Sequence, residues 1–254
     1  MNHAPFSNFD QLADEALAQD FSGWDFSWLH GRWHEEEPSW NYRELVQSAL
    51  LHAESLLDMG TGGGEFLASL SGRPAMTFAT ESYAPNIPIA RARLEPLGVK
   101  VLAIESDEAL PLPDRSLDLA INRHESYWIP ELLRILKPGG TFLTQQVGAL
   151  DCIQINEFLN APTDSDAAVW MLENEIRQLE EAGFQILRAE EAFLDSIFDD
   201  IGAVVFFLKI IGWQIPDFSI EKYRDRLLAM NEQIKDQGPF HAKAHRFLIK
   251  TQKR

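Results

Sequence analysis

The residues best suited to ligand chemistry begin where an apolar segment ends. The stretch Leu56–Gly64 reads Leu-Leu-Asp-Met-Gly-Thr-Gly-Gly-Gly, and Glu65-Phe66-Leu67 after it predicts the first turn of a helix. A glycine-rich turn between a strand and a helix lets the backbone approach a ligand closely and directs free N–H groups at it. We therefore expect ligand contacts from Asp58, Gly60, Thr61, Gly62 and Gly64.

A second acid follows the next strand-like segment. Residues 76–80 read Met-Thr-Phe-Ala-Thr, and Glu81 stands at their end, close to the ~20-residue spacing of an acid that binds a ribose. A carboxylate there can accept hydrogen bonds from both ribose hydroxyls. Nicotinamide-dependent enzymes use the same device, so Glu81, with Ser82 beside it, indicates a ribose-containing ligand without identifying it.

Candidate catalytic groups follow a later strand, predicted over 116–122. Ligands of open α/β sheets bind outside the carboxyl ends of the strands, where this one delivers Asn122, Arg123, His124 and Glu125. An imidazole with a pKa near ~6.5 can accept a proton at neutral pH, so His124 is the candidate general base. Glu125 could orient it or act itself. The alternative is that His124 only hydrogen-bonds a cofactor or caps a turn.

The order of further signals carries a family resemblance. A predicted strand over 99–103 precedes acids and a Leu-Pro pair within 105–114. The strand over 116–122 then leads to a predicted helix over 132–140 that ends in Pro-Gly-Gly, and to a strand over 141–144. Over residues 56–147 the chain resembles the class I S-adenosylmethionine-dependent methyltransferases.

The resemblance implies a role for each expected ligand contact. Asp58 and the glycine turn would hold the methionine end of S-adenosylmethionine, and Glu81 would hold the ribose. The family's adenine-contacting Asp stands four residues before the Leu of Leu-Pro, a position that is Ser106 here. Asp107 or Glu108 would have to serve instead. Asn122 and Arg123 are also expected to contact the cofactor.

Two other functions remain open from the sequence. A nicotinamide-dependent oxidoreductase is disfavoured by Asp58, by the Leu-Lys-Pro-Gly-Gly turn, and by Glu65, where the dinucleotide fingerprint needs its third glycine. A cofactor-binding protein without catalysis would keep the same glycine turn and ribose acid. The expected activity is methyl transfer to a small, neutral or apolar acceptor, on O, N, C or S.

Composition restricts partners and surroundings. The 254 residues carry 22 Lys and Arg against 39 Asp and Glu, a net charge of −17, which disfavours a phosphate backbone as partner. Cys152 is the sole cysteine, no secretory segment is recognisable, and the apolar stretch 201–213 is too short to span a bilayer. We expect a cytoplasmic protein without membrane partners or a bound metal; nothing in the sequence indicates an oligomeric state.

Strands alternating with helices predict a doubly wound parallel sheet. Helices are expected over 9–19, from Asn41, and over 164–182, 198–211 and 218–235, with later strands over 184–193 and 244–251. The resemblance implies seven strands, the last antiparallel. We expect a single methyltransferase domain over 1–254, with a helical cap at 1–50, a cofactor-binding core at 51–150, and a C-terminal half at 151–254 that carries a helical insertion near 196–240.

Two aromatic groups suggest walls for an acceptor. The N-terminal group could form a lid, and the later group an apolar wall. The lid would consist of Trp24, Trp28, Trp33, Trp40 and Tyr42, and the wall of Phe206, Phe207, Trp213, Phe218 and Tyr223.

Overall fold

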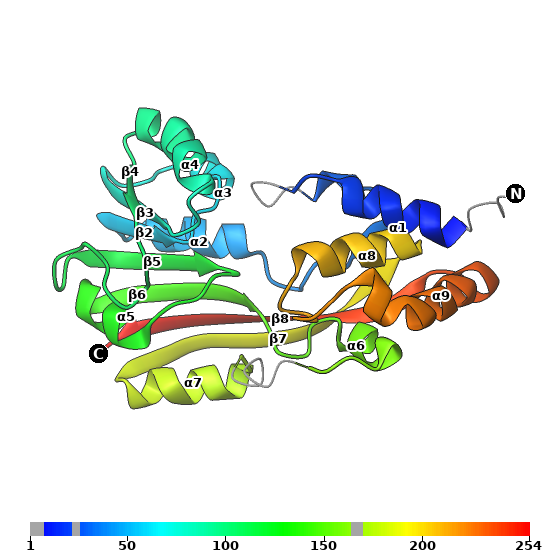
Figure 1. Cartoon of the computed structure of the whole chain (residues 1–254). Coiled ribbons are helices and arrows are strands. Elements are labelled where there is room, and N and C mark those ends of the chain that lie inside the picture. Colours follow the sequence, from blue (N-terminus) through cyan, green and yellow to red (C-terminus); the bar gives the residue numbers. More distant parts are fainter. Residues whose placement is uncertain (1–7, 22–25, 164–169) are drawn as a thin grey trace, which may run out of the picture.

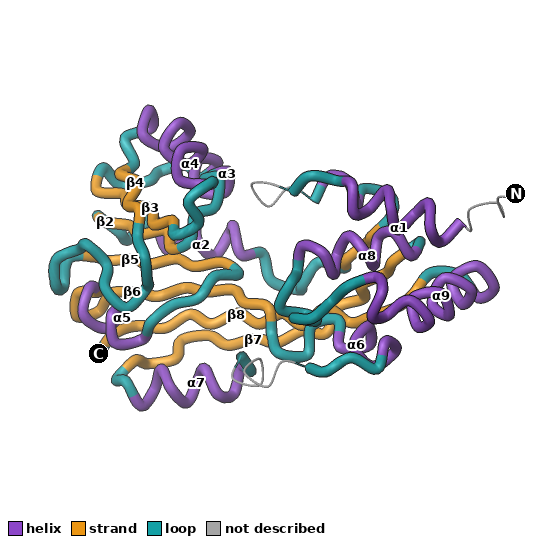
Figure 2. The backbone as a smooth tube through the Cα atoms, viewed as in Figure 1, coloured by secondary structure: helices purple, strands orange, loops and turns teal. Residues whose placement is uncertain are grey.

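A computed structural model describes residues 8–21, 26–163 and 170–254, which form two lobes joined by two long strands (Figure 1). One lobe is a twisted sheet with helices on both faces, and the other is mainly helical. Figure 2 shows the same strands, β7 and β8, passing from the sheet of the first lobe into the second. Within the described ranges, no helix combines the length and the apolarity that crossing a membrane requires.

The sheet has eight strands in the order β1-β7-β8-β6-β5-β2-β3-β4. The five strands from β4 to β6 pair in parallel, whereas β8 is antiparallel to both of its neighbours and β1 is antiparallel to β7. The strands are β1 (Trp33–Glu35), β2 (Ser55–Met59), β3 (Met76–Glu81), β4 (Lys100–Ala103), β5 (Leu117–Arg123), β6 (Leu136–Val147), β7 (Phe184–Phe198) and β8 (Phe240–Lys253).

Helices cover both faces of this sheet because successive strand residues point to opposite sides. Leu56 packs in the cluster under α2, α3 and α4, whereas Leu57 packs in the cluster over α5 and α7. On β6, Leu143 packs in the first of these clusters and Phe142 in the second. These helices are α2 (Tyr42–Leu50), α3 (Glu65–Ser69), α4 (Asn86–Leu94), α5 (Ile129–Ile135) and α7 (Leu172–Glu181), with a 3-10 turn η2 (Glu95–Leu97) after α4.

The second lobe, called the distal lobe below, brings the N-terminal helix together with segments from the second half of the chain. Its core packs α1 against α8, α6 and α9 around the far halves of β7 and β8. The N-terminal helix and the helices before the last strand therefore share one core. The distal-lobe elements are α1 (Asn8–Ala18), η1 (Ser27–Leu29), α6 (Ile153–Leu159), α8 (Ile201–Ile210) and α9 (Ile220–Gln237).

The predicted doubly wound sheet with an antiparallel last strand is confirmed, and its strand count needs correction. The sheet has eight strands instead of seven, because Trp33–Glu35 pairs with the end of β7 as an additional edge strand. The helix predicted over 132–140 is wrong at its end. It stops at Ile135, and residues 137–140 form an irregularity at the start of β6, where the register shifts between Leu117 and Leu119.

The other expected helices and strands lie at the predicted places, with ends that differ by a few residues. Asn41 caps α2, its side chain accepting a hydrogen bond from the Glu44 N–H, as the capping-box pattern predicts. The helix expected from Asp164 begins at Leu172, and residues 164–169 lie outside the described ranges.

Candidate functional site

The glycine turn connects β2 to α3 at the carboxyl edge of the sheet. Gly60, Gly62 and Gly64 have φ values of 64°, 60° and 82°, a region that residues with a side chain adopt only with strain. The turn is tied to β3 at 2.9 Å by a hydrogen bond from the Thr61 N–H to the Thr80 carbonyl. The alternating glycines therefore serve a backbone conformation that this turn requires.

Asp58 lies at the end of β2, directly below the turn. It is 5% exposed, and its Oδ2 accepts a hydrogen bond of 2.7 Å from the Thr61 hydroxyl. Burial and, to a smaller extent, the negative charge of Glu81 raise the pKa of Asp58 to about 7, against the opposing effects of the Thr61 hydrogen bond and Arg123. A cation bound here would favour the ionised carboxylate.

Glu81 ends β3, the neighbouring strand. It is 4% exposed, and its Oε1 accepts a hydrogen bond of 2.8 Å from the Tyr83 N–H, which fixes the carboxylate at the mouth of the turn. Ser82, the next residue, is exposed. Glu81 thus stands beside Asp58 as predicted, and Ser82 stays a predicted contact that no hydrogen bond in the described chain supports.

Glu125 lies over the glycine turn. A Cβ atom on Gly60 would lie 2.2 Å from the Glu125 Cγ, so the two residues are in direct contact. The Glu125 carboxylate accepts a hydrogen bond of 3.1 Å from the Ser126 N–H, and the Ser126 hydroxyl lies 2.6 Å from Asp107 Oδ2. Burial, reinforced by the charge of Asp107, raises the pKa of Glu125, and burial also raises the pKa of Asp107.

The structure separates the two candidates for the adenine contact. Asp107 is joined to Ser126 and faces Glu125, on the side of the glycine turn. Glu108 is exposed, donates its N–H to the Ser106 hydroxyl, and lines a different hollow with Leu110 and Arg134. Asp107 therefore joins Asp58, Glu81 and Glu125 in one acidic group around the turn.

Comparison with known proteins identifies this arrangement. Residues 57–144 match the model of a family described as a methyltransferase domain. Over 220 residues the chain is 28% identical to malonyl-[acyl-carrier protein] O-methyltransferase of Marinomonas sp. (strain MWYL1), covering 77% of this chain and 79% of that protein. The matched region contains the glycine turn and both strand-end acids. Residues 57–144 therefore form a methyltransferase domain, similar to those of the class I S-adenosylmethionine-dependent methyltransferases.

Solved structures share the fold of this methyltransferase. A candidate methyltransferase of Bacillus halodurans C-125 superposes with a TM-score of 0.61 at 20% identity, covering 84% of this chain and 98% of that one. The [4+2]-cyclase SpnF superposes with a TM-score of 0.53 at 18% identity, over 83% and 80%. Because one fold thus hosts different reactions, the assignment of a methyltransferase activity rests on the sequence matches and not on the fold.

The residues at the turn fit the cosubstrate that this family implies. S-adenosylmethionine carries a sulfonium and an ammonium group, both cationic, and a ribose with two hydroxyls. The acidic group would supply carboxylates for the cations, Glu81 would supply an acceptor for the hydroxyls, and the turn would supply backbone N–H groups. No group of three or more His, Cys, Asp or Glu side chains in the described ranges could hold a metal ion.

The end of β5 carries the remaining predicted residues. Asn122 is fully buried, and its side-chain amide accepts from the Thr144 hydroxyl at 2.9 Å and donates to the Ser126 carbonyl at 3.1 Å. It therefore holds the loop that carries His124 and Glu125. Arg123 is exposed, with its guanidinium 5.7 Å from the Phe66 ring centroid. Contacts of Asn122 and Arg123 with a cofactor stay predictions.

Two residues of the expected lid, Trp40 and Tyr42, complete this edge together with Gln145, which the sequence did not indicate. The Tyr42 hydroxyl donates to the Asn122 carbonyl at 2.9 Å, and the Trp40 indole donates to Gln145 Oε1 at 2.8 Å. Polar residues at 144–146, where β6 ends, were the available signal. A pocket of about 380 Å³ opens beside them, lined by Glu37, Pro38, Ser39, Trp40, Asn41, Tyr42, Arg43, Phe66, Arg123 and Gln145.

The aromatic residues divide between the two lobes. Trp28 and Trp33 pack against Phe206 and Phe207 in the distal lobe, whereas Trp40 and Tyr42 lie at the site. Phe206 and Phe207 are buried in the distal core and do not form an exposed wall. The other residues of the predicted lid and wall lie in different surroundings. Trp24 lies outside the described residues, Trp213 is half exposed, and Phe218 stacks on Tyr223.

Proposed function

We propose that the protein binds S-adenosylmethionine at the glycine turn and transfers its methyl group to a small molecule bound in the pocket between Trp40 and Arg123. The observation that carries the proposal is the convergence of Asp58 and Glu81 on a turn in which Gly60, Gly62 and Gly64 have positive φ. Asp107 would lie toward the adenine, because it joins the same acidic group.

When bound, S-adenosylmethionine supplies an electrophilic methyl carbon on a positively charged sulfur. The chain holds the acceptor atom in line with it, and positioning alone can supply ~7–11 kcal/mol of a barrier. As the acceptor atom bonds to the methyl carbon, the electrons of the carbon–sulfur bond return to sulfur. Of the two predicted catalytic residues, Glu125 contacts the glycine turn at Gly60, which supports a place for it beside the reacting atoms.

The pocket lining suggests which acceptor fits. Trp40 and Phe66 offer apolar surface, whereas Arg43 and Arg123 place two cations near the Phe66 ring, at 5.3 and 5.7 Å. The net charge of −17 favoured a neutral or apolar acceptor, but these walls favour one that also carries a polar group. We propose a small acceptor with an apolar part against the aromatics and a polar group toward the arginines.

Calorimetric titration of the full chain with S-adenosylmethionine and with NAD tests the cosubstrate. We expect saturable binding of S-adenosylmethionine alone. Binding of NAD alone would instead favour the oxidoreductase. Release of S-adenosylhomocysteine in the presence of small carboxylic acids, phenols and amines then tests turnover. Cosubstrate binding with no turnover for any class would favour a binding protein without catalysis.

A further inference from the structure

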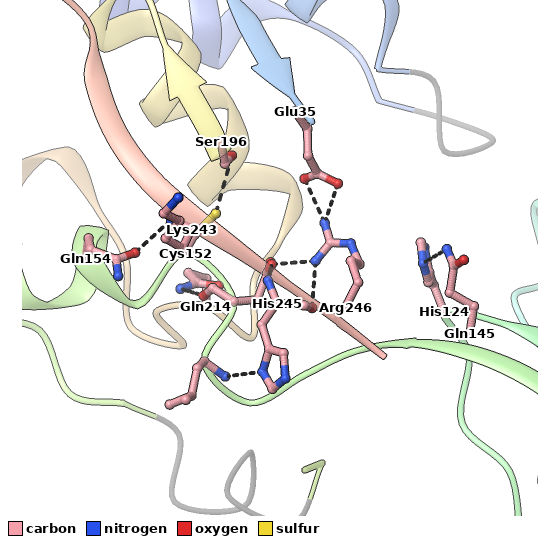
Figure 3. Close-up of polar contacts among 12 residues, drawn as sticks. Glu35, His124, Gln145, Cys152, Gln154, Ser196, Gln214, Lys243, His245 and Arg246 are labelled. Carbon is pink, nitrogen blue, oxygen red and sulfur yellow. Dashed lines mark hydrogen bonds and ion pairs between the residues drawn. The ribbon is translucent and has the colours of Figure 1, made fainter. Parts of the chain in front are cut away.

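Among the residues that the structure describes, the side chain of His124 has one hydrogen-bond partner, which leaves one ring nitrogen free. Its backbone has a φ of +58° and its N–H donates to the Gln145 carbonyl at 2.8 Å, so the residue is held tightly at the end of β5. The imidazole Nε2 lies 3.0 Å from Nε2 of the Gln145 side chain (Figure 3). No described residue hydrogen-bonds to Nδ1, and His124 is exposed, so Nδ1 is open to a ligand.

The orientation of the Gln145 amide is set from its other side. The Trp40 indole N–H, which can only donate, lies 2.8 Å from Gln145 Oε1. Trp40 is 5% and Gln145 6% exposed, so water offers little replacement for this bond. A flipped amide would place its NH₂ against the indole N–H, leaving two buried donors opposed. The Gln145 nitrogen therefore faces His124.

An amide nitrogen donates and does not accept. Nε2 of His124 must then be the acceptor and carry no proton, and in a neutral imidazole the proton resides on Nδ1. If Nε2 of His124 were protonated, its N–H would face the NH₂ group of Gln145, and two donors would stand 3.0 Å apart. The usual reactive state of a histidine base, with a free lone pair, is thus not available while the amide keeps this orientation.

Charges around the ring act in the same direction. Protein atoms packed around the residue, and then the cations Arg246 on β8 and Arg123 on β5, hold the pKa of His124 well below its usual value, although one side of His124 stays exposed. Arg246 is itself bound by Glu35 and Asp151, so its charge is partly compensated. The carboxylate of Glu125, next in the chain, is turned to Ser126 and does not bind the imidazole.

We infer that Trp40 and Gln145 are positioning residues that fix His124 as the neutral Nδ1–H tautomer, which makes it a hydrogen-bond donor in methyl transfer and not the general base. Nδ1–H donates to an oxygen of the acceptor or of the cosubstrate carboxylate. The catalytic consequence rests on the proposed function, but the tautomer does not, because it is a property of the protein alone.

The tautomer is measured on ¹⁵N-histidine-labelled protein without ligands, with the His124 signals assigned by their loss in His124→Ala. We expect the two-bond ¹H–¹⁵N pattern of a neutral Nδ1–H imidazole from pH 5.5 to 8, whereas an ordinary histidine titrates near ~6.5. An Nε2–H pattern, or an imidazolium at pH 6, would overturn the inference.

Two substitutions test the cause. Trp40→Phe keeps the ring but removes the indole N–H, and one neutral hydrogen bond corresponds to about fivefold in an equilibrium. We expect a detectable Nε2–H fraction in this variant. Gln145→Glu puts an acceptor at Nε2, and we expect His124 to titrate near or above ~6.5 with its proton on Nε2. A wild-type pattern in both variants would overturn the role of the pair.

Trp33→Phe is the matched control, because its indole donates to the Ser196 hydroxyl at 2.8 Å in the distal lobe and does not touch Gln145. We expect it to leave the His124 pattern unchanged; the same change as in Trp40→Phe would overturn the specific relay. Once an acceptor is found, kcat is measured against pH for both proteins. The donor role predicts that the wild-type profile shows no ionisation of His124, whereas the Gln145→Glu profile shows one. A wild-type rate that depends on His124 losing a proton overturns it.

Discussion

The Thr61 hydroxyl donates a hydrogen bond of 2.7 Å to Oδ2 of Asp58, and it is the one hydrogen bond that the structure gives to this nearly buried carboxylate within the described chain. That single bond does not offset burial, and the pKa of Asp58 is raised to about 7. The acid that begins the glycine turn is therefore about half ionised at neutral pH. A cationic ligand and a proton compete for it.

Binding of S-adenosylmethionine should strengthen as pH rises through 7. With a pKa of about 7, Asp58 is about one-tenth ionised at pH 6 and about nine-tenths at pH 8. If the ionised form binds the cation, affinity should rise by up to about tenfold between these values. Calorimetry at both pH values measures the change. Asp58→Asn is the control, since it retains only the ligand's own titration; an equal pH dependence in both proteins would contradict the assignment.

The same carboxyl should make the fold less stable toward alkaline pH. The folded pKa of about 7 exceeds the usual 3.8, so the stabilisation from its bound proton is complete below pH 4 and is lost as pH rises to 7. The loss amounts to at most about 4 kcal/mol, at about 1.4 kcal/mol for each pKa unit. The free energy of unfolding, measured with urea at pH 5 and pH 8, should therefore decrease less between these pH values in Asp58→Asn than in the wild type. Equal decreases would mean that the acid ionises freely.

Glu81→Gln should weaken S-adenosylmethionine binding while leaving the fold intact. The substitution removes the charge from hydrogen bonds to the ribose hydroxyls, a difference of about 1 kcal/mol or about fivefold in Kd. Glu95→Gln, at an exposed position after α4, is the control and should bind normally. Thermal unfolding of both variants separates loss of contact from loss of structure. Unchanged affinity in a folded Glu81→Gln variant would remove the ribose assignment.

The acids and glycines of the site were predictable, because each stands at the end of a strand that the sequence displays. Asp58 and Glu81 follow apolar segments, and parallel strands bring their ends to one edge. The pair Trp40–Gln145 was not predictable: 105 residues separate its members, and each side chain alone indicates only a buried polar group. The helix predicted over 132–140 failed at Leu136 because β6 begins irregularly, through pairing with Leu117.

Gly60→Ala and Gly72→Ala form a matched pair. Both glycines have positive φ, at 64° and 69°, so both substitutions carry similar backbone strain. A Cβ at Gly72 meets nothing within 4 Å, whereas one at Gly60 would lie 2.2 Å from Glu125. We expect Gly60→Ala to cost about 1–3 kcal/mol more in free energy of unfolding, and to displace Glu125 and abolish cosubstrate binding. Equal stability and equal binding in the two variants would mean that Glu125 does not lie over the turn.

The ion pairs of Arg246 should be essential for stability, because they compensate two acids inside the protein. Its guanidinium donates to both Glu35 oxygens at 2.9 and 2.7 Å (Figure 3). It also binds Asp151, and so joins β1 to β8 and to the loop after β6. Arg246→Met leaves both carboxylates unpaired, and breaking a buried pair in this way costs about 3–5 kcal/mol. Lys243→Met, on β8 like Arg246, removes an exposed ion pair with Asp195 of β7 and should change stability little. Burial already raises the pKa of Glu35, and loss of Arg246 would raise it further, so the stability deficit of Arg246→Met should shrink as pH falls and Glu35 takes up a proton. Urea unfolding of both variants at pH 5 and 7.5 measures this, and similar small deficits at both pH values would show that the acids do not depend on Arg246.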